Sequence, residues 1–205
     1  MKERPITFNA PMVRALLDGR KTQTRRIMKN QPCGEKIGRV DIRCANGGFQ
    51  WHGVAGESSV FSCPYGRVGD RLWVRESWAF HKMAIGSVQD EDGPFVYASD
   101  EFANQYRITD KWTPSIHMPR FASRITMEIT GVRVEKLQDI SEADAQSEGV
   151  WQCPHGKAWY ASEESNVACA FAIGAYKELW ESISGAGSWD ANPWAWVIEF
   201  KQVMN

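Results

Sequence analysis

A dense polar segment near the N-terminus carries residue types that could do chemistry. The run Gly19-Arg20-Lys21-Thr22-Gln23-Thr24-Arg25-Arg26 places seven polar or charged side chains behind one glycine. Like charge disfavours the ammonium form of a lysine, so an amine at Lys21 could take the proton of a hydroxyl nucleophile such as Thr24. The forked donors of the arginines suit carbonyl, phosphate or carboxylate oxygens. The alternative interpretation is a solvated basic loop.

The spacing within this segment sets a condition on the backbone. Residues three apart in a straight strand face opposite sides. Lys21 and Thr24 can therefore meet only if the chain turns or bulges between them. We expect such a bend because the segment follows a helix.

Local sequence patterns predict the elements around this segment. Pro5–Phe8 alternates as a strand, and Asn9 caps a helix that ends at Gly19. Further strands are predicted at 72–78, 95–97, 122–136 and 194–200, helices at 141–149 and 165–182, a hairpin around Asn46-Gly47 and a bulge at Gly131. This order fits a small mixed barrel decorated by loops.

Length and composition bound the class of protein. The chain has 205 residues, 43% hydrophobic and 24% charged, with a net charge of -1. We predict one domain over residues 1–205, with insertions at about 28–66 and 81–120. No run of about 20 apolar residues is present, so we expect no membrane partner. The near-zero charge argues against a coat for long duplex DNA.

Cysteine usage bears on the compartment and on metal binding. Five cysteines without an export signal predict reduced thiols in a cytoplasmic protein. A zinc site is the alternative, with ligands drawn from Cys33, Cys44, Cys63, Cys153 and His155. Structural zinc sites usually contain a tight Cys-x2-4-Cys knuckle, which this chain lacks. We therefore predict no metal and no cofactor.

The pattern Gly19-x-Lys21-x-x-Thr24-x-Arg26 resembles the signature of ASCH domains, which belong to the PUA-like superfamily of small β-barrels. Thr24 stands where the family usually has an acidic residue, as in the branch that hydrolyses N4-acetylcytidine. The whole-length pattern is similar to ASCH proteins carried by phages and prophages. The resemblance implies an α+β fold, a PUA-like (ASCH) mixed β-barrel with flanking helices.

The resemblance also implies roles for particular residues. Thr24 would be the nucleophile of an amidohydrolase, Lys21 its activator and Glu148 the third member. Glu142 and Asp144 compete with Glu148 for that position. Substrate-binding residues would be Arg20, Arg25, Arg26, Trp73 and Trp78, the tryptophans by stacking on the base.

Two other functions fit the same residues. A non-catalytic RNA-binding module needs only base stacking and a basic edge. A ribonuclease would use a similar set of side chains. In every case the expected ligand is a nucleoside or RNA.

Overall fold

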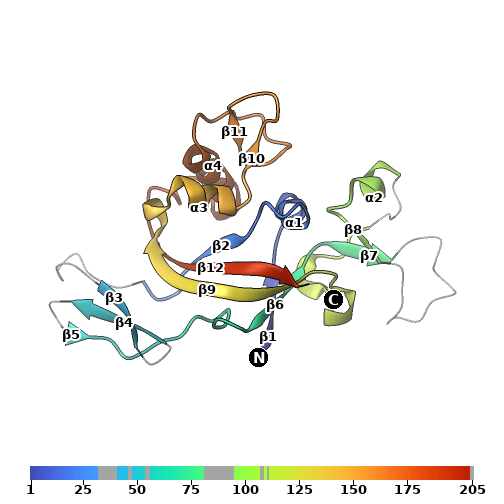
Figure 1. Ribbon diagram of the computed structural model, residues 1–205. Coiled ribbons are helices and arrows are strands. Elements are labelled where there is room, and N and C mark those ends of the chain that lie inside the picture. Colours follow the sequence, from blue (N-terminus) through green and yellow to red (C-terminus); the bar gives the residue numbers. More distant parts are fainter. Residues whose placement is uncertain are drawn as a thin grey trace.

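The computed structural model describes residues 1–31, 41–45, 48–53, 56–80, 95–106, 109 and 111–203 (Figure 1). Its centre is a mixed five-stranded sheet with the order β1-β6-β9-β12-β2. The strands are β1 (Glu3–Thr7), β6 (Arg71–Arg75), β9 (Thr126–Lys136), β12 (Trp194–Val203) and β2 (Gln23–Ile27). β1 pairs with β6 in parallel, and the other pairs are antiparallel. A register shift in the β9–β12 ladder opposite Gly131 confirms the predicted bulge.

The helices lie around the sheet. They are α1 (Ala10–Leu17), α2 (Glu101–Gln105), α3 (Glu142–Ser147) and α4 (Ala172–Ser184), with short 3-10 turns at Ser115–His117, Arg120–Ala122 and Leu137–Asp139. α2 is on the opposite side of the molecule from α3 and α4 (Figure 1). Asn9 and Ser141 cap α1 and α3 as predicted. α4 begins seven residues later than predicted, because Phe171 is still extended. None of the helices in the described ranges is long and apolar enough to cross a bilayer.

The sheet is open, so the prediction of a closed barrel is wrong. β1 and β2 are its two edges, and no backbone pairing joins them in the described residues. A side chain spans the seam instead: Arg26 Nη2 on β2 donates to the Thr7 carbonyl on β1 at 2.7 Å. α1 connects the two edges in sequence, and its Val13 and Leu16 are buried in the core. One guanidinium thus stands where a barrel would have a ladder of backbone hydrogen bonds.

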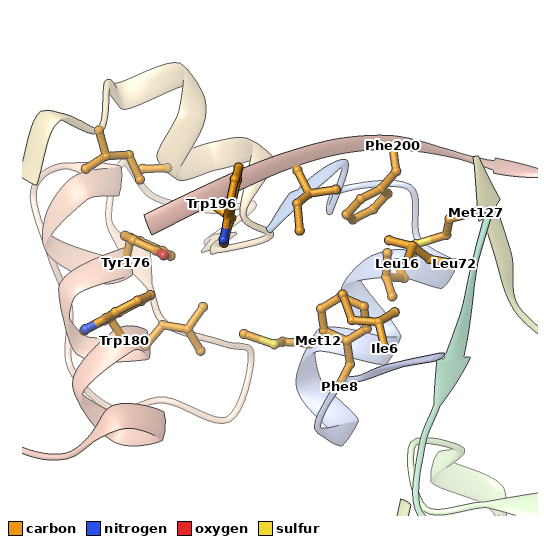
Figure 2. Close-up of a cluster of buried hydrophobic side chains, with 14 of the residues drawn as sticks. Ile6, Phe8, Met12, Leu16, Leu72, Met127, Tyr176, Trp180, Trp196 and Phe200 are labelled. Atoms are coloured by element: carbon orange, nitrogen blue, oxygen red, sulfur yellow. The ribbon is translucent and has the colours of Figure 1, made fainter. Parts of the chain in front are cut away.

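The larger of two hydrophobic cores in the described residues lies between the sheet and the helices α1, α3 and α4. Figure 2 shows part of it, with Tyr176 and Trp180 on α4 facing Met12 on α1 and Trp196 on β12. The alternation of β6 explains which side chains enter the core, since Leu72 and Val74 are buried on its inner face. The same alternation turns Arg71, Trp73 and Arg75 to the outer face.

The insertions contain small sheets of their own. In the first, β3 (Asp41–Ala45), β4 (Gly48–Gly53) and β5 (Gly56–Glu57) form a three-stranded sheet. Ala45 pairs with Gly48, which confirms a hairpin there, although Asn46 and Gly47 themselves lie outside the described residues. Two two-stranded sheets complete the fold: β7 (Trp78–Phe80) with β8 (Phe95–Tyr97), and β10 (Trp151–Gln152) with β11 (Trp159–Tyr160).

Asp70 links the N-terminal strand to the turn before β6 by hydrogen bonds. Its carboxylate accepts from the Lys2 N–H at 2.8 Å, from Arg4 Nη1 at 3.0 Å and from the Arg67 N–H at 3.3 Å. The backbone donor of Lys2 is the largest of the causes that lower the pKa of Asp70 from 3.8 to about 2. A carboxyl with a lowered pKa contributes stability above its unfolded pKa and loses that contribution as the pH falls through the folded value.

We therefore expect Asp70→Asn to lower the melting temperature at pH 7 by roughly 2–6 °C. The difference from wild type should shrink as the pH falls from about 4 to about 2. Asp139→Asn is the control, because this exposed carboxylate makes no hydrogen bond in the described chain. Scanning calorimetry across this pH range measures the effect, and a difference that is independent of pH would contradict it.

Candidate functional site

A buried ion pair joins the polar segment to the end of α3. Lys21 Nζ donates to Glu148 Oε2 at 3.1 Å and to the Glu148 carbonyl oxygen at 2.8 Å. The side chains are 0% and 2% exposed. These partners are 127 positions apart in sequence, so only the tertiary fold brings them together.

Local backbone geometry explains how Lys21 reaches this place. Gly19 has a φ of 73° and ends α1, and the Lys21 N–H then bonds back to the Ala15 carbonyl at 2.9 Å. Gly149 ends α3 with a φ of 92°, and a Cβ there would lie 2.9 Å from Lys21 Cβ. Two chain reversals with glycine therefore pack against each other, and this close approach places the amine beside the carboxylate.

Arg25 is the second cation on Glu148. Its Nη1 donates to Glu148 Oε1 at 3.1 Å, and its Nη2 donates to Glu135 Oε2 at 2.9 Å and Asp144 Oδ2 at 3.5 Å. The Arg25 side chain is fully buried. Arg133 on β9 continues the network by pairing with Glu135, Asp144 and Glu199. The carboxylate of Glu148 is thus held from both sides.

Burial governs the protonation of Lys21. Removal from water lowers its pKa below the usual value, although the Glu148 carboxylate raises it in part. The charges of Arg26 and Arg25 lower the pKa further. The direction agrees with the expectation from sequence that neighbouring cations favour the amine, but the largest cause is burial.

A cavity of about 210 Å³ opens beside this ion pair. Its polar side is formed by Thr24, Arg25, Arg26 and Glu148, and its apolar side by Met12, Ile27, Tyr176, Leu179, Trp180 and Ile183. Thr24 is 1% exposed, and its hydroxyl makes no hydrogen bond within the part of the chain that the structure describes. A hydroxyl without a partner therefore lies at the wall that Glu148 also lines.

The two helices around the cavity are tied together by Glu142. Its carboxylate accepts from the N–H groups of Ala172 and Ile173 at 2.8 and 3.4 Å, the first turn of α4. An acid at a helix N-terminus satisfies free backbone donors and the helix dipole. Glu142 is therefore engaged as a cap, and Asp144 is engaged by Arg133 at 2.9 Å and by Arg25. Of the three acids considered from sequence, only Glu148 lines the cavity.

The predicted site residues fall into two groups. The structure brings Lys21, Arg25 and Glu148 into contact and places Thr24 and Arg26 in the cavity wall with Glu148. Lys21 and Thr24, both within the described residues, are not joined by a hydrogen bond, because Lys21 Nζ donates to Glu148.

Arg20, Trp73 and Trp78 are not among the residues that line this cavity, and their role in substrate binding stays a prediction. Arg20 is at the surface, paired with Asp18 and Glu163. Trp73 is on the outer face of β6, and Trp78 packs in a separate small core with Tyr97, Met118 and Ala122. Alternate side chains of a strand face opposite sides, so only one face of a strand can line a given pocket. Trp73 is on the face of β6 that points away from the main core, and Trp78 belongs to a different core.

The aromatic wall comes from α4, which lies within the helix predicted over 165–182 but was not expected at the site. Tyr176 and Trp180 are four apart on α4, and this spacing predicts a shared face. Helical periodicity identifies a buried face but does not distinguish a packed core from the wall of a cavity. The sequence therefore indicated that Tyr176 and Trp180 share a helix face, but not that this face lines a cavity.

The described residues do not assemble a metal centre. Cys63, Cys153 and Cys169 are free thiols, and within the described ranges no three His, Cys, Asp or Glu side chains are placed to hold an ion. Cys33 lies outside the described residues, as does the side chain of Cys44.

No protein-family model, curated protein or solved structure matches this chain.

Proposed function

We propose that the cavity binds a nucleobase and that its polar wall hydrolyses the amide of N4-acylated cytidine, with Thr24, Lys21 and Glu148 as catalytic residues. The observation that carries the proposal is that Glu148, which pairs with the buried Lys21, lines the same cavity as the unengaged hydroxyl of Thr24. A base, an acid and a nucleophile are the three groups that acyl transfer from an amide needs.

The shape of the cavity supports a planar ligand. Tyr176 and Trp180 supply an aromatic wall, and Thr24, Arg26 and Glu148 supply polar groups on the other side. Pockets for drug-sized ligands are roughly 300–1,000 Å³, so a cavity of about 210 Å³ suits a single ring with a small substituent. The sugar of a nucleoside would then remain at the mouth.

The first half-reaction forms an acyl-enzyme. Proton transfer across the 3.1 Å contact converts the ion pair into an amine at Lys21 and a carboxylic acid at Glu148. Thr24 Oγ1 attacks the acyl carbon and gives its proton to Lys21 Nζ, while Arg26 stabilises the oxyanion. The C–N bond then breaks, the exocyclic nitrogen takes the proton of Glu148, and cytidine leaves.

The second half-reaction restores the site. Water attacks the acyl-threonine and gives a proton to the Glu148 carboxylate. Thr24 Oγ1 leaves with the proton held by the Lys21 ammonium, and the carboxylic acid is released. The proton then returns from Glu148 to Lys21, which restores the ion pair and completes the cycle.

The direct test incubates the wild-type protein with N4-acetylcytidine and follows cytidine and acetate by chromatography. We expect both products in equal amounts, with a burst of cytidine if deacylation is the slow step. N4-acetylcytidine that remains intact at stoichiometric enzyme concentration would eliminate the hydrolase.

The pH dependence of this reaction follows from the lowered pKa of Lys21. The pair needs its shared proton to act as both base and acid, so kcat/KM should fall on the alkaline side once that proton is lost. The midpoint should lie below the usual lysine value of 10.5. Tyr176 cannot cause this limb, because burial raises its pKa well above 10.0. Rates corrected for spontaneous hydrolysis that stay level to pH 10.5 would contradict the role of Lys21.

A non-catalytic RNA-binding module is the second candidate. Arg26 is part of the cavity wall. In the described chain its side chain donates to one acceptor, the Thr7 carbonyl, and its guanidinium carbon lies 5.1 Å from the Phe8 ring centroid. Its remaining donors suit the oxygen of a phosphate or base. RNA binding without turnover of N4-acetylcytidine would favour this candidate.

A further inference from the structure

The outer face of β6 carries an alternating row of arginine, tryptophan and arginine. Arg71, Trp73 and Arg75 point away from the core because Leu72 and Val74 between them point into it. Alternate residues of a strand are about 6.6 Å apart, so the row displays two guanidinium groups on either side of one indole. We call Arg71, Trp73 and Arg75 the β6 row.

Of the two arginines in the β6 row, Arg75 stacks on the indole of Trp73, as does Arg120 from outside the row. The Arg75 guanidinium carbon lies 4.7 Å from the Trp73 ring centroid, and that of Arg120 lies 6.0 Å from it. Trp73 is only 8% exposed although it faces outward. A stacked guanidinium has lost much of its rotational freedom before a ligand arrives, so less entropy is lost on binding an anion.

The acids near the β6 row already have other partners. Glu3 pairs with Arg120 at 2.9 Å, and Glu128 pairs with Lys201 at 3.3 Å. The charge of Arg71 acts on Glu3 without a contact. Within the described part of the chain, Arg71 and Arg75 make no ion pair or side-chain hydrogen bond, and the Nε atom of each is buried without an acceptor. Both side chains are partly exposed, so their terminal Nη donors, but not the buried Nε atoms, remain for an external anion.

The β6 row lies one strand from the seam that borders the cavity. Arg75 is the pairing partner of Thr7 on β1, and the Thr7 carbonyl accepts from Arg26 of the cavity wall. Thr7 is therefore a shared neighbour of Arg26 at the cavity and Arg75 in the β6 row. A polynucleotide carries bases and regularly spaced phosphates, so it can occupy both places, whereas a free nucleoside can occupy only the cavity.

We infer that the β6 row binds the phosphate backbone of single-stranded RNA, and that the ligand of this protein is a nucleotide within an RNA chain. The identification of the ligand as a nucleic acid rests on the proposed function. Phosphate binding by Arg71 and Arg75 can be tested independently of that function. Single-stranded RNA is favoured because its unpaired bases can leave the stack and enter a pocket.

The experiment measures fluorescence anisotropy of a labelled oligouridine of about ten nucleotides, a length within the usual range of single-strand sites. The proteins are wild type, Arg71→Gln/Arg75→Gln and the control Lys111→Gln/Lys157→Gln. The control removes the same charge from two exposed lysines outside β1, β6 and β9. Titrations run from about 50 to 200 mM salt.

We expect the double arginine variant to bind roughly 10-fold to 100-fold more weakly than wild type at the lowest salt. The slope of log K against log salt should fall by about 1.4, which is about 0.7 for each lost phosphate contact. Glu3→Gln should act in the opposite direction and tighten binding by roughly 2-fold to 5-fold, since it removes an acid beside the row. A gain of affinity cannot arise from misfolding.

Three results would overturn the inference. They are wild-type RNA binding too weak to detect, equal binding by the arginine and lysine variants, and tighter binding of phosphatidylserine vesicles than of RNA. Hydrolysis of N4-acetylcytidine by Arg71→Gln/Arg75→Gln separates this inference from the proposed function. We expect that activity to be unchanged, and its absence from wild type would eliminate the hydrolase without affecting the RNA titrations.

Discussion

Thr24→Val should reduce the hydrolysis of N4-acetylcytidine at least 1,000-fold while leaving the fold intact, a loss on the order of that seen when a catalytic nucleophile is removed. Valine keeps the branched shape of threonine and removes only the hydroxyl. That hydroxyl makes no hydrogen bond in the described chain, so its loss should change the free energy of unfolding by less than about 1 kcal/mol. Turnover by chromatography and the melting temperature together measure the effect.

Thr22→Val is the matched control for this variant. Thr22 lies two positions away with an exposed side chain that is not part of the cavity wall. It should keep wild-type turnover, and Thr24→Ser should keep part of it because a hydroxyl nucleophile remains. Equal turnover by wild type and Thr24→Val would remove Thr24 from the mechanism and leave the RNA-binding module as the better candidate.

Arg25→Met should be the most destabilising single change at the site. Methionine fills similar space but leaves the 2% exposed carboxylate of Glu148 with Lys21 as its one cation. Removing one partner of a buried ion pair typically costs about 3–5 kcal/mol, because the other charge stays buried. For a chain of this length that cost corresponds to a fall in melting temperature of roughly 6–20 °C.

Two variants test whether burial is the cause. Arg20→Met also removes an arginine that pairs with two carboxylates, but the Arg20 side chain is 29% exposed and its partners are at the surface. It should change stability by less than about 1 kcal/mol. Adding Glu148→Gln to Arg25→Met should restore part of the loss, since the unpaired charge is then gone. Equal losses for Arg25→Met and Arg20→Met would contradict this explanation.

The network around Glu148 has a consequence for catalysis. Lys21 and Arg25 fix the two carboxylate oxygens separately, at 3.1 Å each. A carboxylate held from both sides cannot rotate freely, so its position relative to the cavity wall is set before a ligand enters. Such preorganisation supports the proposed role of Glu148 in proton transfer.

Much of the local structure could be predicted from short patterns. Asn9 and Ser141 accept hydrogen bonds from the N–H groups three residues ahead, and Gly19 and Gly149 adopt the positive φ that ends a helix. The bulge at Gly131 and the hairpin between Ala45 and Gly48 follow in the same way. These features depend on backbone hydrogen bonds that close within a few residues.

Local patterns did not indicate which aromatic residues line the cavity or whether the sheet closes. Trp73 and Trp78 have the chemistry of a stacking wall, but their strands turn them away from the cavity, and Tyr176 and Trp180 from α4 form its wall instead. Sheet closure depends on whether β1 and β2 approach within backbone hydrogen-bonding distance. Here Arg26 and α1 occupy the seam, and strand patterns contain no information about that approach.

Local patterns predicted many of the strands, the helix ends and the segment from Gly19 to Arg26 that holds the reactive residue types, because each of these depends on neighbours along the chain. Packing between distant segments placed Glu148, rather than Glu142 or Asp144, against Lys21. All three acids lie within seven residues of one another and are chemically alike. Their different roles arise from what α4, β9 and the turn after α1 place beside each carboxylate, which is a matter of packing between distant segments.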